Sequence, residues 1–330
     1  MTKTKFSFSF LIPNLGYSDY LFECIDSIID QECAFCFDYE IVICDQSDDK
    51  VHSLIESEIA KKYFNFPVSL KYLKEKNVSK ARHLLIQNCK YDYCCFVDSD
   101  DYLDKKYIEK IIALLDKEHA PDMIVFNYLQ VDDRGVFYKN NLNVTEEQFL
   151  DYFYYTSSFN SVCMKCFKRT LYNPHDYSNY SNKNGEDFIM SLPLVKKASR
   201  IVVKSDMYIY YYRKHDSSRV KNVDYKDCEY LLLSHREGVD YNNLSFLQKR
   251  LRTDYLLTTL SNFSYKLLHG LKKVTRQQMI DLFKKARFVF KKEKLNIKNC
   301  YGLKQRIMYV LLLLKMYNIL YGLYKHKTKY

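Results

Sequence analysis

The fold is decided by the stretch CCFVDSDD at residues 94–101, an apolar run that ends in three carboxylates. Residues 93–97 are typical of a buried strand, since the run is short, apolar and bounded by a turn signal. Asp98 and Asp100 are two residues apart, so an extended backbone points both side chains to one face. Crowded carboxylates repel each other unless a cation lies between them, and hard oxygen ligands suit Mg²⁺ or Mn²⁺. The stretch therefore predicts a divalent metal that holds a diphosphate. The alternative is a solvated turn before a helix at 107–115.

Apolar periodicity alternates between strand and helix along the first hundred residues. Strands are expected at 6–12, 39–44, 68–73 and 93–97, and helices at 20–29, 51–62 and 79–88. This alternation predicts an α/β sandwich with a mostly parallel sheet, in which ligands lie off the carboxyl ends of the strands. Three of the expected strand ends carry polar clusters, at 13–14, 45–47 and 98–101. Their agreement indicates a nucleotide site.

Composition narrows the class of protein. The chain has 330 residues but only 7 glycines, and it contains neither a GxGxxG nor a GxxxxGK[ST] phosphate loop. Its 11 cysteines cannot all pair, and no apolar leader is expected before the first strand, so we expect reduced thiols in a cytoplasmic protein. Two Cys-x-x-Cys pairs, at 33–36 and 163–166, have zinc-like spacing, but turn residues of a zinc knuckle flank neither.

Charge is divided unevenly along the chain. The stretch from Ser245 to the end carries 20 Lys+Arg and 3 Asp+Glu, a net charge of +17, within a total of +11. The remainder is therefore acidic, at −6, and it holds the aspartate clusters. A basic region of this kind is typical of contact with an anionic partner such as phospholipid, nucleic acid or an acidic polymer. The alternative is a solvated basic surface without a dedicated partner.

The order and spacing of the motifs resemble glycosyltransferase family 2, the nucleotide-diphospho-sugar transferases of the GT-A type. The matching segments are FLIPN at 10–14, the spaced pattern YLxxCIxSI at 20–28, EIVICDQS at 40–47, NVSKAR at 77–82 and FVDSDD at 96–101. The resemblance implies a GT-A α/β/α sandwich as a catalytic domain over residues 1–220. Residues 221–330 are expected to form a mainly helical, basic C-terminal region.

The resemblance also implies how a nucleotide is bound. Pro13 fixes the backbone at the first strand end, where carbonyl and amide groups meet the base. Asp45 accepts a hydrogen bond from a uracil-type N–H, and Asp98 contacts the ribose. Arg82 offers a cationic fork to the diphosphate or base, and Asp100 binds the metal that bridges the two phosphates. Alternatives from the residues alone are a turn acceptor for Asp45 and a surface ion pair for Arg82.

The acidic pair Glu186 and Asp187 precedes an expected helix at 188–195. An inverting transfer needs a base that takes the proton of the acceptor hydroxyl, and the resemblance assigns this role to Asp187. Glu186 is expected to orient the acceptor. The alternative is simple stabilisation of the helix N-terminus. Farther on, the resemblance makes His215 a further metal ligand and brings Arg213 or Lys214 to the pyrophosphate.

The sequence at the end of the chain does not distinguish between three kinds of helix. Residues 307–324 are nearly all apolar or Tyr, with Lys315 as the single charge. Polar residues on one helical stripe favour a helix in the membrane interface; a membrane span and a helix packed on the catalytic domain are the alternatives.

Together these features predict a metal-dependent, inverting glycosyltransferase on the inner face of the cell membrane. We expect it to move a UDP-linked sugar to a lipid-linked saccharide in bacterial surface or capsular polysaccharide synthesis. Nucleic acid is not an expected partner; the competing hypothesis is a non-enzymatic nucleic-acid-binding protein that uses the basic region.

Overall fold

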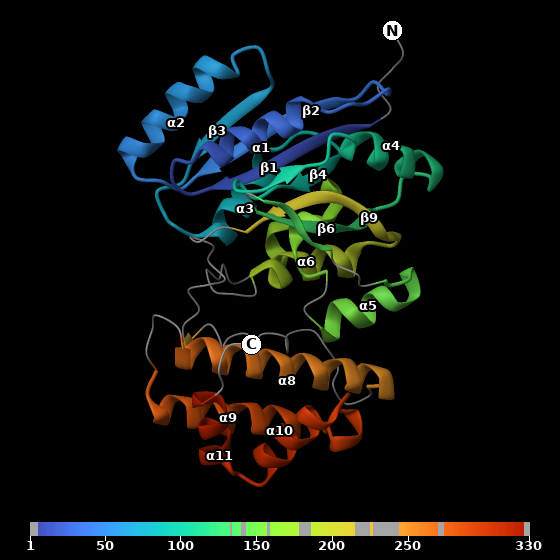
Figure 1. Ribbon diagram of the computed structural model, residues 1–330. Coiled ribbons are helices and arrows are strands. Elements are labelled where there is room, and N and C mark those ends of the chain that lie inside the picture. Colours follow the sequence, from blue (N-terminus) through green and yellow to red (C-terminus); the bar gives the residue numbers. More distant parts are fainter. Residues whose placement is uncertain are drawn as a thin grey trace. The chain divides into compact units, whose positions relative to one another are not determined.

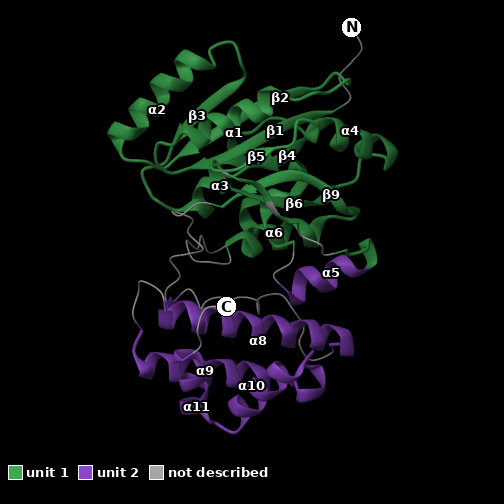
Figure 2. Ribbon diagram, viewed as in Figure 1, with its two compact units in different colours: residues 1–147, 159–182, 186–215 green, residues 148–158, 183–185, 216–330 purple. Residues whose placement is uncertain are grey.

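The structure is a computed structural model that divides into two compact units (Figure 2). The first unit comprises residues 1–147, 159–182 and 186–215, and the second comprises 148–158, 183–185 and 216–330. The structure describes residues 6–132, 134–139, 143–156, 159–177, 186–214, 225–226, 244–269 and 274–326. The expected domain boundary at 220 is retained as a prediction; the division in the structure also gives 148–158 to the second unit.

The first unit is built on one sheet whose strand order is β3-β2-β1-β4-β8-β6-β9-β5, with β7 paired to β6 (Figure 1). Its first half is parallel: β1 (Ser7–Asn14), β2 (Asp38–Asp45), β3 (Val68–Tyr72) and β4 (Tyr93–Phe96). The other strands are β5 (Tyr102–Leu103), β6 (Met123–Asp132), β7 (Gly135–Lys139), β8 (Lys165–Lys168) and β9 (Ile201–Arg213). This second half is mixed, because β8 runs antiparallel to both β4 and β6.

Helices cover the sheet on both faces. They are α1 (Asp19–Ile29), α2 (Asp49–Lys62), α3 (Val78–Asn88), α4 (Tyr107–Lys117) and α6 (Glu186–Lys197). The first three begin at polar side chains, Ser18, Asp48 and Asn77, each of which accepts a hydrogen bond from a backbone N–H of the first turn. Each of these helices starts just beyond a strand, so the caps also fix the strand ends.

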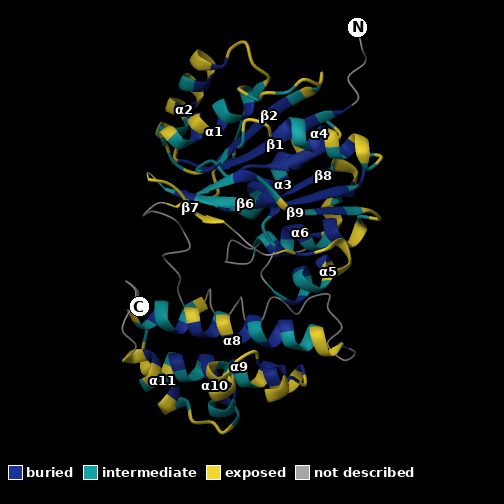
Figure 3. Ribbon diagram, turned by 45° about the vertical axis from the view of Figure 1, so that its right-hand side comes forward, coloured by how far each residue is buried: buried dark blue, intermediate teal, exposed yellow. Residues whose placement is uncertain are grey.

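The core of the first unit follows the central strands, which are buried on both faces (Figure 3). Along β1 the side chains from Phe8 to Ile12 are all fully buried, a continuous run typical of a strand covered on both sides. Phe96 stacks on Phe167 across the β4–β8 pair, with ring centroids 6.3 Å apart. The apolar runs that predicted the strands are therefore the interior of the sheet.

The second unit is helical and has its own core. It contains most of α5 (Glu146–Tyr155), then α8 (Phe246–His269), α9 (Arg276–Lys292), α10 (Leu303–Leu313) and α11 (Tyr317–Lys325). Its core packs Leu256, Leu260, Phe283 and Phe290 together. A buried ion pair joins α8 to the end of α9, since Arg252 donates to both carboxylate oxygens of Glu293 at 3.0 and 3.1 Å. Bidentate geometry compensates the two charges for their loss of water.

The expectation of one continuous helix at 307–324 is wrong. The chain turns between α10 and α11, and Lys315 adopts a left-handed conformation there, with φ of 59°. The run contains no proline, and its one glycine, Gly322, lies beyond the break within α11, so the sequence gives no sign of the turn. Both short helices pack onto α8 and α9, and this packing accounts for the break. Within the described ranges, every helix is too short or too polar to cross a membrane.

His83 on α3 provides a test of the packing in the first unit. Its ring is buried against Tyr177, and Nδ1 lies 2.9 Å from the Tyr172 hydroxyl. Burial lowers the pKa of His83 to about 4 from an ordinary 6.5. The unfolded chain therefore binds a proton that the folded chain does not, and the free energy of unfolding falls as the pH drops from 6.5 towards 4.

We expect His83→Phe to abolish this part of the acid sensitivity, which amounts to about 3 kcal/mol at 1.36 kcal/mol per pH unit. Urea unfolding of both proteins at pH 7, 6, 5 and 4 measures the difference. Parallel pH profiles for wild type and variant would contradict a neutral buried histidine.

Candidate active site

The carboxyl ends of β1, β2 and β4 lie side by side in the first unit. The β1–β2 register sets Pro13 opposite Cys44 and Asn14 opposite Asp45. The N–H of Val97, just after β4, donates to the carbonyl of Leu11 at 3.0 Å. Three segments that are far apart in the sequence thus meet at one edge, as the parallel sheet predicts.

Arg82 connects Asp98, a predicted nucleotide-binding residue, with Asp187, the predicted base. Its Nη1 lies 2.5 Å from Oδ1 of Asp187, and its Nη2 lies 3.4 Å from Oδ1 of Asp98. The guanidinium is buried, with 4% of its side chain exposed, whereas about a third of each carboxylate side chain is exposed. Burial by itself would lower the pKa of Arg82, but Asp187 and Asp98 outweigh it and raise that pKa. Arg82 therefore remains charged and fixes the distance between the proposed base and the end of β4.

Negative charge is crowded after β4. Burial raises the pKa of Asp98 to about 6; Arg82 opposes this rise, while Asp187 and Asp100 add to it. Asp101 is fully buried, accepting from the Tyr210 hydroxyl at 2.6 Å and from the backbone N–H of Arg213 at 2.8 Å. Burial, followed by Asp100 and Asp98, raises the pKa of Asp101 well above its usual range. Asp101 thus ties the acidic turn to β9.

The residues around the turn fit a divalent cation in part. Asp98 and Asp100 offer hard carboxylate oxygens, and the pKa of Asp98 is raised first by burial and then by the neighbouring Asp187 and Asp100. No group of three possible ligands occurs within the described ranges, and the predicted ligand His215 lies outside them. A bound Mg²⁺ or Mn²⁺ would offset the charge of a diphosphate and take its remaining ligands from phosphate and water.

Arg213 lies beside α1. Its guanidinium is 4.1 Å from the ring centroid of Tyr20 and 5.1 Å from that of Tyr102, and Nη2 pairs with Glu23 at 2.5 Å. These contacts anchor the end of β9. The predicted contact of Arg213 or Lys214 with a pyrophosphate is still a prediction, and the observed role of Arg213 is to fasten two elements.

Lys165, a buried lysine at the start of β8, was not predicted as a site residue. Its ammonium donates to the carbonyl of Phe159 and, at 2.7 Å, to that of Ser161. The intervening carbonyl of Asn160 accepts from Ser191 at 2.9 Å, one turn after Asp187 on α6. Burial lowers the pKa of Lys165 to about 7, against the opposing effect of Asp187. In the sequence, the position of Lys165 within the apolar segment 162–167 is the one sign that this lysine is buried.

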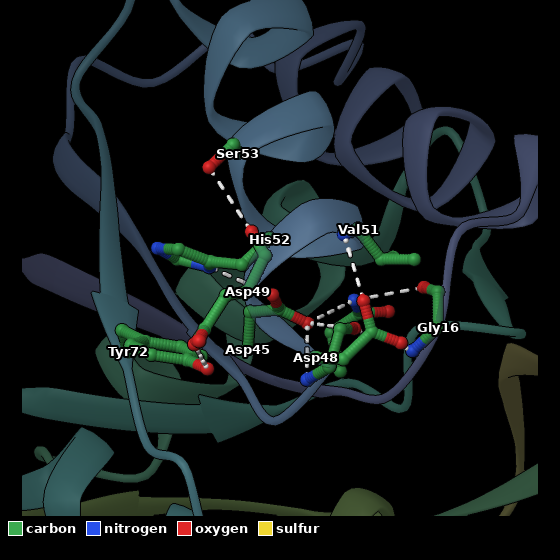
Figure 4. A network of polar contacts seen from close by, with 10 residues as sticks. Gly16, Asp45, Asp48, Asp49, Val51, His52, Ser53 and Tyr72 are labelled. Carbon is green, nitrogen blue, oxygen red and sulfur yellow. Dashed lines mark hydrogen bonds and ion pairs between the residues drawn. The ribbon is translucent and has the colours of Figure 1, made fainter.

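Asp45 is at the centre of a polar network at the end of β2 (Figure 4). The carboxylate accepts from Asn14 at 2.9 Å and from the Ser47 hydroxyl at 2.6 Å, and it lies 2.8 Å from Nδ1 of His52. Asp45 is fully buried, as is the neighbouring Pro13. The predicted contact of Asp45 with a base is untested, and in this structure the carboxylate is occupied by the chain itself.

This geometry defines the class of protein: an α/β domain with polar strand ends, an acidic turn and a carboxylate at the N-terminus of a helix is typical of the GT-A fold. The family model described as "Glycosyl transferase family 2" matches residues 9–175, so the chain belongs to that family. Both the resemblance drawn from the motifs and the GT-A fold class are confirmed.

The relatives that the chain resembles are named as glycosyltransferases. The chain is 26% identical over 220 residues to the poly(ribitol-phosphate) beta-N-acetylglucosaminyltransferase TarS of Staphylococcus aureus, a match covering 66% of this chain and 37% of TarS. It is 25% identical over 226 residues to glycosyltransferase GlyA of Streptococcus pneumoniae, covering 64% of this chain and 31% of GlyA. The chain therefore spans about a third of the length of these relatives.

Solved structures extend the similarity in fold. A crystal structure of S. aureus TarS residues 1–349 in complex with UDP-GlcNAc matches 97% of this chain and 90% of that chain, with a TM-score of 0.63 and 18% identity. A second crystal structure of S. aureus TarS residues 1–349 matches with a TM-score of 0.61 and 19% identity. At this level of identity the comparison establishes the fold.

The Arg82 bridge predicts a large effect of removing its charge. Arg82→Met leaves two carboxylates facing each other without a counter-charge, which for a buried pair costs about 3–5 kcal/mol. We expect release of nucleoside diphosphate from a sugar nucleotide to fall by at least about 100-fold, as for other lost transition-state contacts.

The matched control is Lys80→Met, two residues earlier on α3, where the ammonium forms a half-exposed pair with Glu75 at 2.5 Å. A surface pair contributes at most about 1 kcal/mol, so this variant should keep its melting temperature and activity. Equal activity in both variants would show that the bridge has no role in the reaction.

Proposed function

We propose that this protein is a metal-dependent, inverting glycosyltransferase that uses a UDP-linked sugar. The observation that carries the proposal is the Arg82 bridge, because it joins the strand end at Asp98 to the helix start at Asp187. The nucleotide of the donor is bound at the strand ends by Pro13, Asp45 and Asp98. Asp100, with His215 outside the described residues, provides metal ligands. The family supports the enzyme class over the competing hypothesis of a non-enzymatic nucleic-acid-binding protein.

Asp187 is suited to the role of general base. It lies in the first turn of α6, its carboxylate is held by Arg82 at 2.5 Å, and about a third of its side chain is exposed. As the acceptor oxygen attacks the anomeric carbon, Asp187 takes the hydroxyl proton and the bond to the nucleoside diphosphate breaks. Glu186, beside it in the same turn, orients the acceptor. Inversion follows from a single displacement without a covalent enzyme intermediate.

The acceptor is proposed to be a lipid-linked saccharide in the synthesis of a bacterial surface or capsular polysaccharide. Relatives named for poly(ribitol-phosphate) support a polymeric acceptor. The net charge of +17 from Ser245 onward supports binding of this region to an anionic partner. That partner would be a lipid headgroup or a phosphate-containing polymer chain.

The second unit offers a surface for an anionic membrane. Leu303, Ile307 and Leu314 are exposed and spaced so that they share one face of α10, and Ile319 and Leu323 do so on α11. The neighbouring Lys and Arg side chains are exposed as well: Lys304, Arg306, Lys315 and Lys325. Apolar side chains with basic neighbours fit the headgroup region of a membrane, so we propose a peripheral location on the inner face of the cell membrane.

Turnover tests the enzyme directly. We expect one sugar nucleotide from a panel of UDP- and GDP-sugars to release its diphosphate in Mn²⁺ or Mg²⁺, and chelator or Asp100→Ala to abolish release. Asp187→Asn should lower transfer by about 10²–10⁴-fold, the usual contribution of a general base, while UDP binding by calorimetry is retained. Transfer that survives chelation, or full activity in Asp187→Asn, would contradict the mechanism.

Co-sedimentation with vesicles tests the membrane surface. We expect binding to phosphatidylglycerol vesicles but not to phosphatidylcholine vesicles, and loss of binding in Leu303→Ser/Ile307→Ser. The matched control is Phe64→Ser on the first unit, since Phe64 is 76% exposed and Leu303 is 74% exposed. Salt-dependent binding to DNA without binding to vesicles would instead favour the nucleic-acid hypothesis.

A further inference from the structure

Lys165 is a buried cation at the start of β8, the strand that lies between β4 and β6 and runs antiparallel to both. None of its surface is exposed, so its ammonium has lost its water and needs acceptors from the chain itself. Two carbonyls supply them, that of Phe159 and, at 2.7 Å, that of Ser161. The sheet therefore holds the backbone of this lysine, and the segment 159–161 holds its charged end.

The segment 159–161 adopts a backbone conformation that needs support. Phe159 has a φ of 59°, in the left-handed region that bulky side chains rarely adopt. Such a conformation persists only where the surroundings hold it in place. The ammonium of Lys165 binds the carbonyls on either side of Asn160, so it holds both ends of this short segment.

The same segment is joined to the helix that carries the proposed base. The carbonyl of Asn160 accepts from the hydroxyl of Ser191 at 2.9 Å, and Ser191 is fully buried on α6. Ser191 comes four residues after Asp187, so both side chains lie on one face of the helix. Lys165 is therefore linked to α6 through the segment 159–161.

Lys165 also acts on Asp187 through its charge. Burial lowers the pKa of Lys165 to about 7, and Asp187, followed by Cys163, opposes this fall. The ammonium and the carboxylate of Asp187 are thus near enough to attract each other. Because Arg82 lies 2.5 Å from the same carboxylate, two buried cations act on the proposed base.

We propose that Lys165 is a positioning residue for the transfer reaction, because it holds the segment 159–161 against α6 and so keeps Asp187 in the orientation that receives the acceptor proton. The inference rests on the proposed function, since it takes Asp187 to be the general base. It adds a residue on β8, a strand that carries none of the predicted site residues.

The two ends of the site should respond differently to the loss of this lysine. Without its ammonium, the carbonyls of Phe159 and Ser161 lose a buried donor, and the segment they belong to no longer fixes Ser191. The first turn of α6 can then shift, and a shift of about 1 Å at a reacting group can cost about 100-fold in rate. The nucleotide is proposed to bind at the ends of β1, β2 and β4, so its affinity should change little.

Hydrolysis of a sugar nucleotide tests the role of Lys165 without a known saccharide acceptor, because water then supplies the proton that Asp187 takes. The probe is the member of the UDP- and GDP-sugar panel that the wild type hydrolyses fastest. We expect Lys165→Met, which keeps the apolar stem but removes the charge, to lower kcat by about 30-fold. The KM of the sugar nucleotide and the affinity for its nucleoside diphosphate by calorimetry should stay within about twofold of wild type.

Ser191 tests the same link from the other end. We expect Ser191→Ala to lower kcat by about tenfold, and Ser191→Thr, which keeps the hydroxyl, to restore most of the rate. The variant Lys165→Met/Ser191→Ala should be no slower than Lys165→Met, since residues that act through one segment are non-additive. If Lys165→Met does not fold, the two Ser191 variants still decide the question.

The matched control is Lys168→Met, three residues later on the same strand. The ammonium of Lys168 pairs with Asp122 at 2.9 Å, and a third of its side chain is exposed. Removing this partly exposed pair should leave kcat and KM unchanged, because such a pair contributes at most about 1 kcal/mol to stability. A loss of rate in Lys168→Met equal to that in Lys165→Met would assign the effect to the strand instead of to Lys165.

Three results would overturn the inference while the wild type remains active: an unchanged kcat in Lys165→Met and in Ser191→Ala, additive losses in the double variant, or a loss of nucleotide affinity as large as the loss of rate. Failure of the wild type to hydrolyse any sugar nucleotide of the panel would overturn the proposed function itself, and this inference with it.

Discussion

The first unit depends on the buried guanidinium of Arg82. Arg82 lies between Asp98 and Asp187, two carboxylates that are 89 residues apart in the sequence and would repel each other without it. The bridge fixes the start of α6 relative to the end of β4. Burial makes the arrangement rigid, because a guanidinium out of water must retain its partners. The same contact holds the Asp187 carboxylate in one orientation.

Around this bridge, the strand ends are organised by backbone pairing and by buried acceptors. The parallel strands β1, β2 and β4 bring their polar ends to one edge, and two fully buried aspartates secure it, Asp45 on one side and Asp101 on the other. Each holds groups from elements distant in the sequence: Asp45 holds Asn14 and His52, and Asp101 holds Tyr210. Both buried carboxylates accept hydrogen bonds from within the chain. The side chains of Asp98 and Asp187 are each about a third exposed.

In the second unit, apolar residues are found both in the core and on the surface. Its apolar residues are divided between a core shared by α8, α9, α10 and α11 and exposed positions on the last two helices. A soluble helical unit buries such side chains where it can, and exposed ones that share a face with basic neighbours are typical of contact with a lipid surface. The basic part of the chain is therefore the part that also exposes apolar side chains, whereas the aspartate clusters belong to the first unit.

Local patterns in the sequence were sufficient for the parallel half of the sheet, its three capped helices and the family, because periodicity, caps and ordered motifs are local properties. They also identified Asp98 and Asp187 as site candidates. They did not identify the antiparallel insertion of β8, the break at Lys315, the pairing of Arg82 with both carboxylates, or the burial of Asp45, Asp101 and Lys165. Each of these depends on which distant groups meet in three dimensions. Exposure and hydrogen-bond partners, which decide whether a carboxylate binds a ligand or holds the fold, are properties of the tertiary structure alone.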